Sequence, residues 1–221
     1  MKQQFPKLSI FHTFKTKREQ LTGEAIRQRH IISHLARENS STLMTRTAIA
    51  QNIAKKNNLL WKNLYSGVFR DLDEILIPLG IVEEAGRLPL KRGPKALQEK
   101  GIPFYHLTNK GFLVALSIDE VKNKNELLRD FLSTDQMKDK GLEDSIRILL
   151  DISPNFVFFI FENYVKAHCD GKIKELLPFE ILQLKQILGK NFGIQREMLE
   201  GFVSLSTSHR KNILSLLAKF E

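Results

Sequence analysis

Polar and cationic residues between residues 59 and 101 have the types and spacing that suit binding to a polyanion. Four lie on one side of a predicted helix, and five lie in the loop that follows it: Lys62, Asn63, Ser66 and Arg70 on the helix, and Arg87, Lys91, Arg92, Lys95 and Lys100 in the loop. Arginine and lysine can hydrogen-bond to guanine edges and asparagine to adenine, while cations on a loop neutralise phosphates and release counterions. These residues therefore form the predicted binding site for a nucleic acid.

The residues that usually carry catalysis or hold metals are not arranged for either task. His30 and His34 have the four-residue spacing of two metal ligands on a helix, but no third ligand is evident and the glutamate of a zinc protease is missing between them. His168 and Cys169 form a single adjacent pair, and we interpret the cysteine as a small buried residue. The sequence also lacks a glycine-rich phosphate loop and a serine nucleophile elbow. We therefore expect no enzyme activity, no metal and no cofactor.

The positive charge of the chain is concentrated in its first half. The formal net charge is +9, and the sequence pI is about 9.6. Residues 1–118 hold 19 Lys and Arg against 9 Asp and Glu, whereas residues 119–221 hold 15 against 16. A charge spread evenly over a chain would be explained by solubility alone. A basic half joined to a neutral half instead predicts a polyanion-binding module that carries a second domain.

Size, cysteine content and hydropathy limit the class of protein. A chain of 221 residues can bury a sizeable core without disulfides or metals. Its one cysteine cannot form an internal disulfide, which suits a reducing compartment. The longest apolar run, residues 156–161, is far shorter than the roughly 20 residues that span a bilayer, and charged residues interrupt the N-terminal segment where a signal peptide would be apolar. We expect a cytoplasmic protein that has no membrane partner.

Three helices are expected in the first part of the chain, after residues 1–20, which form either a basic arm or a loose tail. The helices are predicted at about residues 24–38, 46–56 and 59–77, and the short break at Asn57 and Asn58 gives the last two the spacing of a helix-turn-helix. The third helix has apolar residues at three- and four-residue steps, which predict one buried stripe: Leu60, Leu64, Val68, Leu72, Ile75 and Leu76.

Two short strands and a long basic loop are expected after the third helix. Pro78 disfavours helix at the residue before it, and Gly80 lets the chain turn away. Residues 81–84 then predict a strand and residues 104–107 a return strand, with residues 86–101 as the loop between them. A connection of this length in a compact domain is usually either functional or disordered.

Two short strings flank this loop. Residues 105–111 are Tyr-His-Leu-Thr-Asn-Lys-Gly, and residues 79–82 are Leu-Gly-Ile-Val. The first resembles the Tyr-x-Leu-Thr-x-x-Gly string that closes the wing of many bacterial and archaeal winged helix-turn-helix regulators, and the second resembles their passage from recognition helix into wing. The resemblance covers residues 22–118, about half of the chain. It implies a major-groove face and a wing that touches phosphates or a minor groove: Lys62, Asn63, Ser66 and Arg70 on the face, and Arg87, Lys91, Arg92 and Lys95 on the wing.

The second half of the chain predicts helices and no strand. The candidates are residues 119–132, 142–150, 154–168, 178–188, 195–205 and 208–220. Residues 156–161 are apolar on every side of their helix, which predicts the central helix of a small bundle, although a contact between subunits would also bury it. Other apolar residues are expected to surround it: Ile146, Leu149, Leu150, Leu176, Leu177, Leu182, Leu184, Leu188, Leu199, Phe202, Leu205, Ile213, Leu216 and Leu217. Because two-fold proteins bind two-fold sites, a homodimer through these helices is a further hypothesis.

The predicted fold is therefore mainly α with a small β-hairpin wing, in which a winged helix-turn-helix domain at residues 21–118 is followed by an all-α domain at residues 119–221. The predicted function is binding to double-stranded DNA as a transcriptional regulator, with the helix at residues 59–77 in the major groove and the wing at residues 86–101 on the backbone or in the minor groove. One alternative is a winged helix that binds protein, as a subunit of a replication, transcription or segregation assembly. Another is an RNA-binding module, which would more usually expose aromatic residues for stacking.

Overall fold

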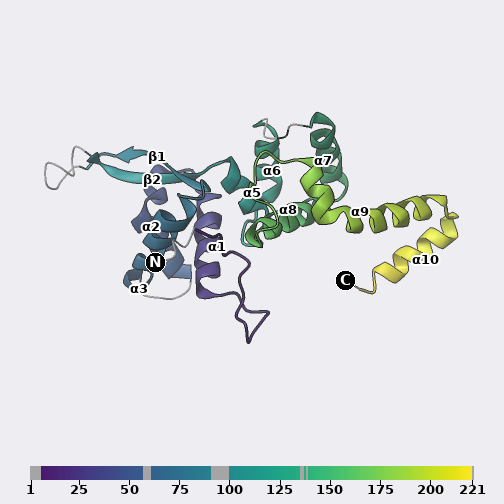
Figure 1. Ribbon diagram of the computed structural model, residues 1–221, viewed down its shortest axis with the longest axis horizontal. Helices are drawn as coiled ribbons and strands as arrows, with labels where there is room; N and C mark the ends of the chain where they lie inside the picture. The colour runs from purple at the N-terminus through teal and green to yellow at the C-terminus, as the bar shows by residue number, and fades with distance from the viewer. Residues whose placement is uncertain (1–5, 57–60, 91–99, 135–136, 138, 221) are drawn as a thin grey trace. The chain divides into compact units, whose positions relative to one another are not determined.

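The computed structural model of the chain describes residues 6–56, 61–90, 100–134, 137 and 139–220 (Figure 1). The side chains of Lys56, Trp61, Lys62 and Asn63 are also outside this description. The chain divides into two compact units, Met1–Ile181 and Leu182–Glu221. The boundary suggested by the sequence, between residues 118 and 119, does not coincide with this division.

The first unit begins with the three predicted helices. These are α1 (Gly23–Leu35), α2 (Arg46–Lys56) and α3 (Trp61–Arg70). The hydroxyl of Thr22 accepts a hydrogen bond from the first turn of α1, so that one of the free N–H groups at this helix end is satisfied. The helix ends at Leu35, before the residues up to Glu38 that the sequence included in it.

The helix α3 continues into a π-helical turn, η2 (Asp71–Leu76). The backbone N–H of Ile77 donates to the carbonyl oxygen of Leu72 at 2.9 Å, a bond over five residues that widens the turn. Asp71 and Leu72, at the start of this turn, both lie in the interior. The prediction of one helix over residues 59–77 missed this turn. The predicted apolar stripe is confirmed at Val68, Leu72 and Leu76, which are fully buried.

Two antiparallel strands follow, β1 (Val82–Leu88) and β2 (Ile102–Leu107), with Val82 opposite Leu107. Both strands are longer than predicted: β1 continues to Leu88, into the segment that the sequence assigned to the loop, and β2 begins two residues earlier than expected, at Ile102. The ladder is irregular between Glu84 and Gly86. Gly86 has a φ of 153°, and a Cβ at this position would lie 3.0 Å from the ring of Phe104, so the irregularity requires a glycine.

The hairpin is joined to the helices on both sides. A 3₁₀ turn, η1 (Ser41–Met44), precedes α2, and Thr45 beside it forms a β-bridge with Phe104. After β2, Thr108 caps the next helix, α5 (Asn109–Leu116): its hydroxyl accepts from the N–H of Gly111 at 3.1 Å and donates to the carbonyl of Gly80 at 2.6 Å. The threonine therefore ties the start of α5 to the chain segment that enters β1.

The remaining helices of the first unit are α6 (Lys124–Leu132), α7 (Lys140–Ile152) and α8 (Pro154–Cys169). The helix α5 packs against α6 and α8, which explains why the chain up to residue 181 is one compact unit. Phe161 of α8 is fully buried, as expected for a central helix, and its ring lies edge-on to Phe131 with centroids 6.2 Å apart.

The second unit contains most of α9 (Ile181–Ser204), and all of α10 (Thr207–Leu217). The sequence suggested two helices, at residues 178–188 and 195–205, but α9 is continuous. A glycine inside a helix costs only about 1 kcal/mol, so the glycines of this segment do not end it. Several residues predicted to be in a bundle core are exposed: Leu182, Leu199, Ile213, Leu216 and Leu217.

Over the described residues, the fold is mainly helical with one small antiparallel sheet of two strands, which confirms the predicted fold class of a mainly α chain with a small β-hairpin. Three helices, the β-hairpin and α5 follow one another along the chain, and further helices come after them. In the part of the chain that the structure describes, no helix combines the length and the apolar character needed to cross a membrane.

Candidate nucleic-acid interface

The outward face of α3 carries two of the polar residues predicted for it: Ser66 is exposed, and the side chain of Arg70 is 49% exposed. Asp73, in the following turn η2, is exposed as well. These residues lie opposite Val68 and Leu72, which are buried, so the helix presents one apolar side to the core and one polar side to solvent. The predicted partners Lys62 and Asn63 share this helix by sequence, and their side chains lie outside the described residues.

Arg70 is not a free cation. Its Nη2 lies 3.6 Å from Oε2 of Glu24 on α1 and 3.4 Å from Oδ1 of Asp71. Two carboxylates therefore share the charge of this guanidinium, which reduces what it can offer to a phosphate. Sequence reasoning missed these contacts because Glu24 is far from α3 along the chain.

A buried ion pair fixes α3 against α1. Arg27 binds Asp71 in a bidentate manner, with Nε 2.5 Å from Oδ2 and Nη2 3.2 Å from Oδ1, and the side chain of Asp71 is 0% exposed. Burial raises the pKa of Asp71 by more than the Arg27 guanidinium lowers it. The guanidinium passes close to Gly67, where a Cβ would lie 2.9 Å from Nε, so the glycine makes room for this contact.

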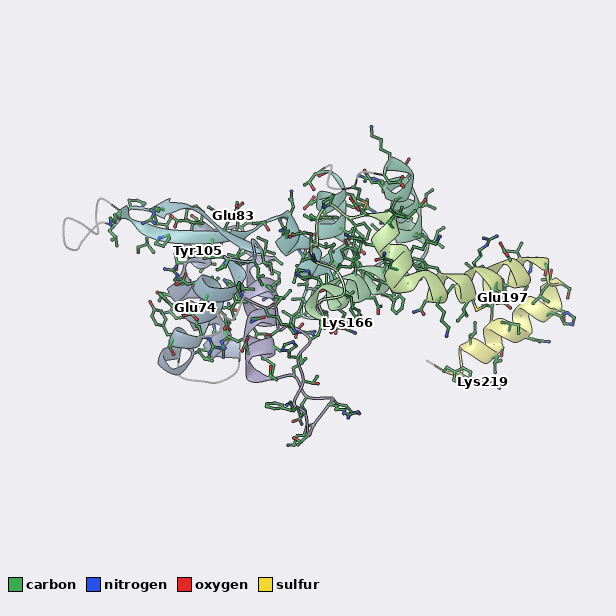
Figure 2. The ribbon with its side chains drawn as sticks, viewed as in Figure 1. Glu74, Glu83, Tyr105, Lys166, Glu197 and Lys219 are labelled. Carbon is green, nitrogen blue, oxygen red and sulfur yellow. The ribbon has the colours of Figure 1, made fainter. Side chains whose placement is uncertain are left out.

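A second arginine joins α2, α3 and β2. Arg46 forms an ion pair with Asp73, and its guanidinium lies 4.8 Å from the ring centroid of Phe69 and 5.1 Å from that of Tyr105. Figure 2 marks Tyr105 on the hairpin, and this residue is 1% exposed. The contact therefore sets the position of the hairpin relative to the exposed face of α3.

The wing itself brings two of the predicted residues together. Nη1 of Arg87 on β1 donates to the carbonyl oxygen of Lys100 at 3.1 Å, and Nε of Arg87 donates to Oε1 of Glu84 at 2.6 Å. Both basic side chains are exposed, and Lys100 has no ion pair with another described residue. The other predicted wing residues, Lys91, Arg92 and Lys95, lie outside the described residues.

The base of the wing carries exposed acidic residues beside its basic ones. Glu83 and Glu84 are both exposed, and Oε1 of Glu83 lies 2.6 Å from Nε2 of His106 across the ladder. The acidic pair was visible in the sequence, but its place beside the basic residues depended on where β1 begins. Within the described part of the wing, acidic and basic charges therefore nearly balance.

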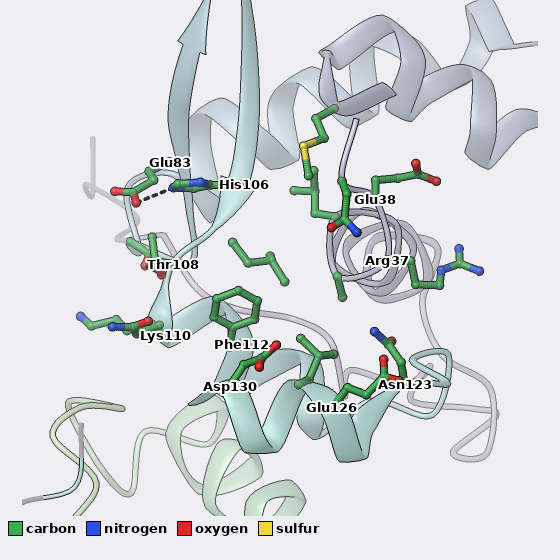
Figure 3. Close-up of a pocket in the computed structure, with 18 of the residues that line it drawn as sticks. Arg37, Glu38, Glu83, His106, Thr108, Lys110, Phe112, Asn123, Glu126 and Asp130 are labelled. Atoms are coloured by element: carbon green, nitrogen blue, oxygen red, sulfur yellow. Dashed lines mark hydrogen bonds and ion pairs between the residues drawn. The ribbon is translucent and has the colours of Figure 1, made fainter. Parts of the chain in front are cut away.

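A cleft of about 770 Å³ opens beside the base of the wing, between the end of α1, β2, α5 and α6 (Figure 3). Phe112 contributes to its apolar lining. Its carboxylates outnumber its basic groups: Glu38, Glu83, Glu126 and Asp130 against Arg37 and Lys110, with His106 beside them. Such a lining repels phosphates, so this cleft is not part of the candidate nucleic-acid interface.

The surroundings of His34, His168 and Cys169, the possible metal ligands or nucleophile, favour a structural role for each of them. His34 is 2% exposed, and its Nε2 lies 2.9 Å from the carbonyl oxygen of Leu43. Burial raises the pKa of the Cys169 thiol to about 12 and lowers the pKa of His168, so both groups stay neutral near pH 7. Among the described residues, no group of three or more His, Cys, Asp and Glu side chains is arranged to hold a metal ion.

Comparison with known proteins identified no relative of this chain. No family model matches the chain, and neither a curated protein nor a solved structure is significantly similar to it. The candidate interface therefore rests on the residues of this chain: an exposed polar face on α3, an exposed Arg87–Lys100 pair on the wing, and two arginines that fix both elements to the core.

Proposed function

We propose that residues 22–118 bind double-stranded DNA, with α3 in the major groove and the wing on the backbone or in the minor groove, as the DNA-binding head of a transcriptional regulator. The observation that carries this proposal is the exposed polar face of α3, centred on Ser66, which follows a short connection from α2. A helix of this width fits the major groove, and a hydroxyl can bond to several base edges.

The distribution of unpaired cations supports the proposal. Among the described residues of the first 118, the basic side chains that are exposed and form no ion pair are Lys7, Lys15, Lys17, Arg18, Arg37, Lys55 and Lys100. Except for Arg37, which lines the acidic cleft, these side chains and Lys91, Arg92 and Lys95 in the sequence of the wing loop are the charges available to phosphates. Their attraction to a duplex depends on released counterions and would weaken steeply with salt.

The test is a titration of labelled random duplex with the wild-type chain and with two serine variants. Ser66→Glu places a negative charge on the exposed face of α3, where repulsion by the phosphates is expected to weaken binding at least tenfold. Ser145→Glu on α7 adds the same charge to a helix outside the candidate interface. Equal weakening by both variants, or by neither, would contradict the assignment of α3.

The proposal includes two finer points. We propose that the protein acts in the cytoplasm, on the nucleoid if the cell is prokaryotic, without a catalytic role, a metal or a cofactor. We also propose that it acts as a homodimer through its C-terminal helices, because two related heads would read a two-fold site.

A second candidate function is suggested by the acidic residues next to the interface. Asp73 and Glu74 in η2 and Glu83 and Glu84 on β1 are exposed, and a surface of mixed charge suits a protein partner better than a phosphate backbone. A winged helix that serves as a subunit of a larger assembly would show no salt-dependent complex with random duplex. The same titration therefore separates the two functions.

A further inference from the structure

Apolar side chains are exposed over much of the second unit. Along the last part of α9, along α10 and just beyond it, they are between 38% and 81% exposed: Ile194, Met198, Leu199, Val203, Ile213, Leu214, Leu216, Leu217 and Phe220. The buried residues of α9, Leu184 and Leu188, both lie in its first half. Scattered exposed leucines need no explanation, but a set this dense marks a contact surface.

Each of the two helices is amphipathic, with its apolar residues on one side. At 100° per residue, Met198, Leu199 and Val203 fall within one half of the circumference of α9, while Arg196 and Glu200 fall on the other half. The apolar residues of α10 likewise share one side. An amphipathic helix normally buries its apolar side against other elements. Here the apolar side of the last part of α9 and the apolar side of α10 are both exposed to solvent.

The turn between the helices holds them as a hairpin. Oγ of Ser206 accepts from the N–H of His209 at 3.4 Å and caps α10. Nε of Arg210 donates to the carbonyl oxygen of Phe202 at 3.1 Å, and the same guanidinium bonds to the carbonyl of Val203 at the end of α9. A groove of about 560 Å³ lies along the hairpin, lined by residues of both helices that include Met198 and Ile213.

We infer that the hairpin of α9 and α10 pairs with the same hairpin of a second copy of this chain, so that the two form a four-helix bundle. A unit of roughly 40 residues usually needs disulfides, metals or association to bury enough apolar surface. Residues 182–221 contain no cysteine, and their described part holds no cluster of metal ligands. Association with a hairpin of the same pattern supplies the missing core.

The size of the surface agrees with a stable dimer. Nine apolar side chains that are about half exposed leave on the order of 800 Å² of apolar surface, which is about what each partner buries in an interface of standard size. An antiparallel pairing of two α9 helices would place Met198, which lies in the middle of the exposed apolar residues of α9, close to the two-fold axis.

This inference deepens the homodimer part of the proposed function by naming the contact surface, and it is tested without DNA. Light scattering of the full-length chain at micromolar concentration should give twice the mass of one chain, which is 25.5 kDa. The double variant Leu199→Glu with Val203→Glu should give the mass of one chain, because both charges would be buried in the bundle. Circular dichroism of this double variant should show that its helices are retained.

The matched control is the double variant Ile148→Glu with Ile152→Glu on α7, two exposed apolar residues with the same four-residue spacing. It should remain a dimer. A second measurement uses Met198→Cys, which lies near the expected two-fold axis and should form a covalent dimer under mild oxidation, whereas Ile148→Cys should not.

Three results would overturn the inference while leaving DNA binding to be judged separately. The first is a wild-type chain that is a monomer at micromolar concentration. The second is a double variant, Leu199→Glu with Val203→Glu, that stays dimeric. The third is a monomeric chain whose α9–α10 hairpin binds vesicles of anionic lipid. Loss of dimer with retained duplex binding would show that the head acts alone.

Discussion

At the scale of single residues, the pairing of Arg27 with Asp71 is the contact on which the exposed face of α3 most depends. The carboxylate is fully buried and receives two bonds from one guanidinium. Removing one member of a buried pair leaves the other unpaired. Asp71→Ala should therefore lower the free energy of unfolding by about 3 kcal/mol, as measured by urea denaturation.

The control for this prediction is an exposed pair of the same chemistry. Nε of Arg196 lies 2.7 Å from Oε1 of Glu200, and both side chains are mostly exposed. Glu200→Ala should cost no more than about 0.5 kcal/mol. A loss of similar size in the two variants would show that burial does not strengthen the Arg27–Asp71 pair.

Cys169 gives a prediction about alkaline pH. Burial raises the pKa of its thiol from 9.0 to about 12, so the folded chain keeps the proton at a pH where the unfolded chain releases it. The stability contributed by this group is present below the unfolded value and is lost as the pH rises above it. One unit above pH 9, this group has lowered the free energy of unfolding by about 1.4 kcal/mol.

The measurement compares urea denaturation of the wild-type chain and of Cys169→Ala at one unit below and one unit above pH 9. The variant should lose about 1.4 kcal/mol less over this interval, whatever constant cost the smaller side chain adds. Equal losses in the two proteins would mean that the thiol titrates in the folded state as it does in the unfolded state.

Helical periodicity was sufficient to predict that Ser66 and Arg70 of α3 are exposed, because a three- and four-residue pattern of apolar positions defines the buried side. The ion pair of Arg70 with Glu24 could not be predicted in this way. It depends on the distance between α1 and α3, and no local pattern in the sequence encodes that distance. The same reason explains why Arg46 was missed as the contact between α2 and β2.

At the scale of elements, the Thr108-to-Gly111 segment shows why a short string can carry structural information. The threonine caps α5, and a Cβ on Gly111 would lie 2.2 Å from the carbonyl oxygen of Ile81. The glycine is therefore required for the close approach of α5 to the start of β1. The cap could be predicted from the sequence because Thr108 and Gly111 are close along the chain, whereas the approach of Gly111 to Ile81 is a tertiary contact that the string alone does not reveal.

Gly111→Ala should lower the free energy of unfolding by at least about 3 kcal/mol, because the methyl group meets a backbone atom that cannot move aside easily. Gly193→Ala is the matched control, since Gly193 also lies within a helix but has no atom within 4 Å of its added Cβ. There the exchange should be neutral or stabilising by up to about 1 kcal/mol. Urea denaturation of both variants compares them, and a tolerated Gly111→Ala would contradict the role given to the close contact.

The element boundaries that the sequence missed have a common cause. The strands β1 and β2 are longer than predicted because each pairs with the other, and pairing partners are not visible from one strand alone. The single helix α9 was predicted as two because its glycine and asparagine residues resemble a break. Tertiary pairing and helix continuity outweigh such weak local signals.

At the scale of the whole molecule, the basic and the neutral parts of the chain have different roles in the proposed function. The first part presents α3 and the wing, and the second unit presents an apolar hairpin. The charge surplus could be counted in the sequence. The exposed surface of the hairpin could not, because apolar residues in a predicted bundle are expected to be buried.

The measurement that tests DNA binding most directly is the salt dependence of the affinity for a random duplex. If α3 and the wing neutralise about six phosphates, the logarithm of the binding constant should fall with the logarithm of the salt concentration at a slope of about −5. The double variant Arg92→Ala with Lys95→Ala should make this slope shallower by about 2 and weaken binding to every sequence. The control is Lys122→Ala with Lys174→Ala, at exposed lysines outside the interface, and it should leave the slope unchanged. A chain that forms no salt-dependent complex, or a slope that the wing variant does not alter, would contradict the account.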